Sequence, residues 1–165
     1  MIVIGYQGIG KTTLCNDKDA NVLKCVDLES SSFFNDDGIR PDDWYVYYCN
    51  IAENLSKQNC LVFVSSHKVV RDRLLESDQN VVCIFPSLEL KDKWIEKLRL
   101  RYENTLTEKD FKALVNAEEK YEENIKELKN CGLHCIEIND IDYKLKELVI
   151  DYEIELMTNY LKETI

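Results

Sequence analysis

A glycine-rich stretch directly after the first apolar run is the feature that most restricts how this chain can fold. Residues 2–5 read IVIG and residues 5–12 read GYQGIGKT, so three of the five glycines lie within the first ten residues. The spacing fits GxxxxGK[ST] at every fixed position, a pattern that needs a strand before it and a helix after it. The N-terminal segment therefore predicts a strand, a tight loop and a helix, the opening unit of an α/β fold.

The residues of this loop have the chemistry of a phosphate-binding site. Glycines allow positive φ angles and close backbone approach, so successive N–H groups can converge on phosphate oxygens at the positive end of the following helix. Lys11 is then placed to reach the β and γ phosphates, and Thr12 to bind Mg²⁺. The pattern predicts ATP and Mg²⁺ as cofactors, with ATP against GTP left open. The predicted nucleotide-binding residues are Gly5, Gln7, Gly8, Ile9, Gly10, Lys11, Thr12 and Thr13.

Four more apolar, β-branched runs follow at wide spacing and indicate a parallel sheet. With residues 2–5, the predicted strands lie at 22–26, 60–64, 81–85 and 133–138. Because several of these runs are uninterrupted rather than alternating, the strands should be buried on both faces. Helical spacing of apolar residues predicts helices at 41–58, at 87–102, from Thr107 to a turn at Gly132, and at 141–161. The predicted fold class is α/β, one domain over residues 1–165 with a five-stranded parallel sheet and helices on both faces.

The net charge and the cysteine content indicate which partners the protein can bind and in which cellular compartment it lies. The formal net charge is −10 and the pI about 4.7, so a general attraction to nucleic acid is not expected. No apolar run approaches the roughly 18 to 20 residues that span a bilayer, and no basic leader precedes the loop, so no membrane contact is expected. Seven cysteines without CxxC spacing predict free thiols in a reducing cytoplasm rather than a disulfide framework. The oligomeric state stays open.

Three later segments carry a resemblance that the loop alone does not. They read VDLESSSF, SSHKVVRDRL and PSLELKDKWIEKLRLRY, and they follow the second, third and fourth predicted strands. The chain contains no NKxD stretch of a GTPase, and its strand CLVFVSSH ends without the acid of an AAA-type motor. The chain therefore resembles the small P-loop kinases, the group of the nucleoside monophosphate, gluconate and shikimate kinases. It looks most like the compact nucleotide kinases of phages and prophages.

This resemblance implies a three-layer P-loop NTPase fold and a phosphoryl transfer. The γ-phosphoryl group of ATP would move to a nucleoside monophosphate, deoxynucleotides included. Residues 28–58 would receive the acceptor, and a lid at residues 87–104 would close over the donor phosphates. The implied partners are a nucleotide donor and a small phosphorylated acceptor.

Four residues outside the loop are candidates for this reaction. Asp27 ends the second predicted strand, at the edge where open parallel sheets bind ligands, and would act as a base or hold the metal through water. Arg71 lies one helical turn after the third strand and would bind the acceptor. Arg99 and Arg101 of the lid would stabilise charge on the transferring phosphoryl group. Together with Lys11, the residues Asp27, Arg99 and Arg101 form the predicted catalytic set.

Two other functions remain open at this point. A hydroxyl acceptor, as in the gluconate and shikimate kinases, would use Asp27 as its base. A nucleotide-binding regulator would turn ATP over slowly and use the acidic C-terminal helix from Ile141 as a contact surface. The supply of arginines favours a phosphate acceptor, because a phosphate is held by arginines and needs no base.

Overall fold

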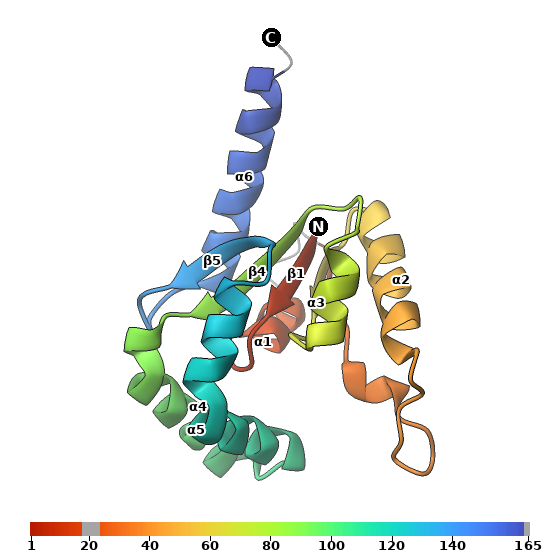
Figure 1. The fold of residues 1–165 in the computed structure, drawn as a ribbon. Coiled ribbons are helices and arrows are strands. Elements are labelled where there is room, and N and C mark those ends of the chain that lie inside the picture. Colours follow the sequence, from red (N-terminus) through yellow and green to blue (C-terminus); the bar gives the residue numbers. More distant parts are fainter. Residues whose placement is uncertain (18–23, 164–165) are drawn as a thin grey trace.

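The structure, a computed structural model, describes residues 1–17 and 24–163. Its centre is a parallel sheet of five strands in the order β2-β3-β1-β4-β5 (Figure 1). The strands are β1 (Ile2–Gly5), β2 (Cys25–Asp27), β3 (Leu61–Val64), β4 (Val81–Pro86) and β5 (His134–Ile138). The predicted five-stranded parallel sheet is confirmed. Of the second predicted strand, residues 22 and 23 lie outside the described residues.

Helices connect and cover the strands. The α-helices are α1 (Lys11–Asn16), α2 (Trp44–Lys57), α3 (Lys68–Leu74), α4 (Lys91–Thr105), α5 (Glu108–Lys129) and α6 (Leu145–Glu163), and two 3-10 helices are η2 (Ser30–Phe33) and η3 (Leu88–Leu90). Helix α2 packs on α3, α1 on α6, and α4 on α5. In the described part of the chain, no helix is both long and apolar enough to cross a membrane.

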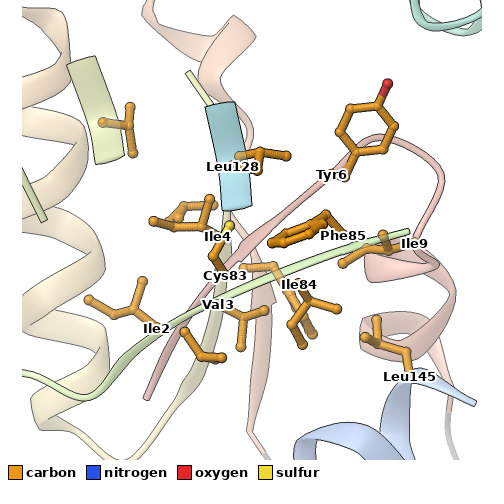
Figure 2. Close-up of a cluster of buried hydrophobic side chains, with 14 of the residues drawn as sticks. Ile2, Val3, Ile4, Tyr6, Ile9, Cys83, Ile84, Phe85, Leu128 and Leu145 are labelled. Carbon is orange, nitrogen blue, oxygen red and sulfur yellow. The ribbon is translucent and has the colours of Figure 1, made fainter. Parts of the chain in front are cut away.

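The apolar strands are buried between two helical layers. Every residue of β1, β3 and β4 is buried, as expected for uninterrupted apolar runs in a covered parallel sheet. Figure 2 shows Leu128 of α5 and Leu145 of α6 on opposite sides of the central strands, with Ile4 and Cys83 facing the first and Ile84 the second. The three-layer α/β architecture is therefore confirmed.

Three predicted α-helices begin later than their sequence patterns indicate. In the one predicted at 87–102, η3 comes first and α4 starts at Lys91. Helix α2 starts at Trp44, because residues 41–43 form a turn in which the Trp44 N–H donates to the Pro41 carbonyl over 3.1 Å. Helix α6 starts at Leu145 rather than at Ile141. The residues before it turn so that Tyr143 reaches the glycine loop, where its hydroxyl donates to the Ile9 carbonyl over 2.8 Å.

Helices α4 and α5 form an antiparallel hairpin at the carboxyl edge of the sheet. Thr107 caps α5 by accepting a hydrogen bond from the Asp110 N–H over 3.2 Å, which agrees with the predicted helix start at Thr107. Lys120, with φ of −132° and ψ of 17°, interrupts the helical geometry of α5. The predicted lid at 87–104 is therefore one arm of a longer structure, and the first half of α5 is the other arm.

One pair of cysteines corrects the expectation of free thiols. Cys15 at the end of α1 and Cys25 at the start of β2 form a disulfide, with their Cα atoms 5.0 Å apart. The other five cysteines are unpaired. The pairing arises because the short helix α1 packs against the edge strand β2. A cross-link over a loop of this length stabilises a fold by about 2–3 kcal/mol in the chain-entropy account.

Candidate active site

The glycine loop lies at the carboxyl end of β1, in the middle of the sheet. The connection after β1 leads to β2 on one side, whereas the connection after β4 leads to β5 on the other. Neighbouring parallel strands whose connections diverge in this way leave a crevice, which is where open α/β sheets bind ligands. A cavity of about 980 Å³ opens here, and its walls are the loop, the end of β2, the α4–α5 hairpin and residues 143–146.

The loop has the backbone geometry of an anion cradle. Gly8 and Gly10 have φ of 84° and 93°, a region that L side chains rarely adopt. At Gly8 a Cβ would also lie 2.8 Å from Leu98 Cδ2, so α4 packs directly against the loop there. The residues that sequence analysis assigned to the nucleotide line the cavity, except Gly5: they are Gln7, Gly8, Ile9, Gly10, Lys11, Thr12 and Thr13.

Gly5 lies below the cradle and holds its lysine. The Lys11 ammonium donates to the Gly5 carbonyl over 2.9 Å, with the remaining N–H donors free of any described protein acceptor. Burial lowers the pKa of Lys11, and the nearby carboxylates of Asp27 and Glu29 act in the opposite direction. A partly desolvated ammonium at the cavity floor is well placed to bind a phosphate, which would replace the lost solvation.

Asp27 lies beside the hydroxyl of Thr12, the residue that the sequence predicts to bind Mg²⁺. Thr12 Oγ1 donates to Asp27 Oδ2 over 2.6 Å, and both residues line the cavity. A hydroxyl and a carboxylate oxygen suit Mg²⁺, which takes one or two protein oxygens together with phosphate oxygens and water. Among the described residues no group of three or more His, Cys, Asp or Glu could hold a metal alone. The residues present therefore fit a magnesium ion that arrives with a nucleotide.

The hairpin brings cationic groups to the opposite wall of the cavity. Arg101 on α4 lines it and forms an ion pair of 2.7 Å with Asp110, which is buried. Lys97, one turn earlier, lies over the rings of Trp94 and Tyr143 at 4.4 and 4.9 Å. Burial lowers the pKa of Lys97, and the Arg101 charge lowers it further. The cavity thus has positive charge on the hairpin and carboxylates at the sheet edge.

Arg99 and Arg71 do not line this cavity. Arg99 binds Glu96 over 2.6 Å and Glu118 over 2.9 Å on the outer side of the hairpin. Residues two apart on a helix point roughly 200° apart, so Arg99 and Arg101 cannot face the same side. Arg71 is buried, and it donates to the Ser66 carbonyl and to Glu127, each over 2.8 Å. These two arginines stabilise the helices around the site.

Sequence reasoning missed Arg40, which lies in the segment predicted to bind the acceptor. Its guanidinium stacks on Phe34 and Trp44, 4.3 and 4.5 Å from the ring centroids. It also contacts Ser30 Oγ at 3.2 Å and His67 Nε2 at 3.3 Å. Arg71, Arg73, Arg99 and Arg101 each pair with a carboxylate, whereas Arg40 has no carboxylate partner among the described residues. No local pattern in the sequence marks this difference.

Comparison with known proteins adds little to this geometry. No family model and no curated protein sequence matches the chain. Among solved structures, a shikimate kinase from Bacteroides thetaiotaomicron aligns with 98% of this chain and 97% of its own length, at 12% identity and a TM-score of 0.49. A likeness this distant carries no argument about activity, so the function must be argued from the site.

Proposed function

We propose that this chain is an ATP-dependent phosphotransferase that moves the γ-phosphoryl group of ATP to a nucleoside monophosphate, deoxynucleotides included. The observation that carries the proposal is the shared cavity. The phosphate loop, the Thr12–Asp27 pair and the cationic hairpin all face it. Its volume of about 980 Å³ lies near the upper end of the range for small-molecule sites, which suits two substrates bound side by side.

The loop and Lys11 are assigned to the donor. The N–H groups at Gly8 and Gly10 and the first turn of α1 bind the phosphate oxygens, and the Lys11 ammonium binds between the β and γ phosphates. Thr12 and Asp27 would hold Mg²⁺. The ion, when bound, neutralises charge on the β and γ oxygens during the transfer.

Asp27 is assigned to the metal rather than to a base. Its Oδ2 already accepts the Thr12 hydroxyl, 2.6 Å away, so its carboxylate faces the expected metal position. An acceptor phosphate is ionised near neutral pH and attacks without losing a proton to the protein. This favours a monophosphate over a sugar hydroxyl as the acceptor, because a hydroxyl would need a base.

The hairpin is assigned to the transition state. Arg101 and Lys97 supply positive charge towards the transferring group, and Lys109 forms an ion pair with Glu29 across the cavity mouth. This ion pair links the hairpin to the segment that follows β2. Arg99, which faces outward, has no part in this assignment.

Arg40 is assigned to the acceptor phosphate. Arg40 does not line the cavity itself, but it donates to Ser30 Oγ of the cavity wall over 3.2 Å, and it has no carboxylate partner among the described residues. We expect Arg40→Ala to raise the KM for the acceptor by about 10- to 100-fold, the value of a charge-assisted hydrogen bond, and to leave ATP binding unchanged. Arg73→Ala, which removes an arginine paired with Glu53, is the matched control and should change neither value.

An acceptor panel tests the proposal as a whole. ADP release is followed with ATP or GTP against ribo- and deoxynucleoside monophosphates and small sugar acids. Strong stimulation by one monophosphate is the expected result. Stimulation by a sugar acid alone would make the chain a hydroxyl kinase, and slow turnover that no acceptor stimulates would favour the nucleotide-binding regulator.

A further inference from the structure

Two aromatic side chains from distant parts of the chain hold carbonyl groups of the glycine loop. The indole N–H of Trp94 on α4 donates to the Gln7 carbonyl over 3.0 Å. The hydroxyl of Tyr143, just before α6, donates to the Ile9 carbonyl over 2.8 Å. The two bonds span 87 and 134 residues of sequence, so nothing in the loop itself provides them.

These bonds determine where the next N–H groups point. The structure has no cis peptide bonds among its described residues, and in a planar trans peptide the carbonyl and the following N–H point in opposite directions. Turning the Gln7 carbonyl towards Trp94 therefore turns the Gly8 N–H away from it. Turning the Ile9 carbonyl towards Tyr143 does the same for the Gly10 N–H.

The loop needs such anchors because its two pivots are glycines. Gly8 and Gly10 can adopt positive or negative φ at little cost, so the peptide planes before them could rotate if nothing held them. No backbone carbonyl of a described residue accepts the Gly8 or Gly10 N–H. The aromatic donors supply the restraint without using these N–H groups, which stay free for a ligand.

The two donors are themselves held firmly. Trp94 is fully buried, and its ring stacks on that of Tyr143 at 6.0 Å with an angle of 15° between the planes. Lys97 lies over both rings, which adds a cation–π contact to each. The pair thus forms one rigid block between the hairpin and the start of α6.

We propose that Trp94 and Tyr143 are positioning residues that aim the Gly8 and Gly10 N–H groups into the phosphate site. The inference rests on the proposed function, since it takes the loop to bind a polyphosphate. It adds that the cradle is aligned before the ligand arrives, by donors outside the loop, and that the phosphate affinity depends on them.

Tyr143→Phe tests this, with Tyr121→Phe as the matched control. Phenylalanine keeps the ring and removes the hydroxyl. Tyr121 is buried and Tyr143 partly buried, and Tyr121 also donates its hydroxyl to a backbone carbonyl, that of Ser87 over 2.9 Å, but this carbonyl lies outside the loop. Both variants should lose similar stability in urea unfolding. Only Tyr143→Phe should bind Mg·ATP more weakly, by about 3- to 10-fold, the range that one hydrogen bond contributes.

Inorganic tripolyphosphate has no adenine ring, so its affinity reports phosphate binding by the loop alone. We expect Tyr143→Phe to weaken tripolyphosphate binding by the same factor as Mg·ATP binding. If Tyr143→Phe binds only ATP more weakly, and tripolyphosphate as before, Tyr143 contacts the adenine ring and the proposal is overturned. Equal affinities in Tyr143→Phe and Tyr121→Phe would overturn it as well.

An NMR measurement without ligand tests the positioning role of Tyr143 separately from the proposed function. Protein labelled with ¹⁵N-glycine gives five backbone amide signals, one for each glycine. In Tyr143→Phe the Gly10 signal should shift or broaden, while those of Gly38 and Gly132 stay in place. If the wild type binds neither ATP nor tripolyphosphate, the proposed function fails, and an unchanged Gly10 signal would then refute the positioning role too.

Discussion

Lys11→Ala is expected to reduce ATP turnover by at least about a hundred-fold, the loss seen when one preorganised group that stabilises transition-state charge is removed. Lys11 is the only loop side chain with a positive charge, and its ammonium lies at the cavity floor, where its one acceptor among the described residues is the Gly5 carbonyl. A phosphate at this position gains most of its charge neutralisation from this group. Coupled ADP release under saturating Mg·ATP measures the effect.

The fold of this variant should survive. Burial lowers the pKa of Lys11, which means that the folded protein disfavours the charged form, so removing the charge costs no electrostatic stability. Lys112→Ala is the control: Lys112 is exposed and pairs with Glu108 one turn before it on α5. Equal turnover in Lys11→Ala and Lys112→Ala, both folded by circular dichroism, would remove the loop from the mechanism.

Asp27→Asn is expected to lower kcat by on the order of a hundred-fold and to raise the Mg²⁺ concentration needed for half-maximal activity. Asparagine keeps the size of the side chain and can still accept the Thr12 hydroxyl, but it carries no charge for the metal. The measurement is a Mg²⁺ titration of ADP release at fixed ATP. A shift in the half-saturating Mg²⁺ concentration identifies Asp27 as a metal-holding residue.

Glu29→Gln is the matched control for Asp27. Glu29 also lines the cavity, but its carboxylate pairs with Lys109 rather than with Thr12. Its change should leave the Mg²⁺ dependence as in the wild type. If Asp27→Asn instead removes the acid limb of the pH–rate profile and leaves the Mg²⁺ dependence unchanged, Asp27 is a base and the acceptor is a hydroxyl.

One feature of the site lowers the stability of the folded protein, and the rest of the fold must offset this loss. Burial of the Lys11 ammonium disfavours its charged form and so lowers stability in the absence of a ligand. The buried apolar side chains of Figure 2 and the Cys15–Cys25 disulfide stabilise the fold and offset this cost. An ammonium held in this way is ready to bind without rearrangement.

Much of the fold was predictable because its signals are local. Apolar runs such as IVIG and LVFV predict strands buried on both faces whatever follows them. The predicted helix starts at residues 41 and 141 were both too early, and at residue 141 the reason is tertiary. Apolar residues continue back to Ile141, but the Tyr143 hydroxyl binds the loop and keeps this residue out of the helix. Periodicity alone cannot distinguish these two uses of one side chain.

The sequence by itself predicted where the glycine loop lies, since GYQGIGKT is contiguous and two of its own glycines supply the positive φ angles. It also contained the reason to separate Arg99 from Arg101, whose spacing puts them on different helix faces. Only the tertiary structure decided which groups meet: Thr12 with Asp27, Tyr143 with Ile9, and Cys15 with Cys25. Such pairs depend on how strands and helices pack, and no spacing along the chain encodes that packing.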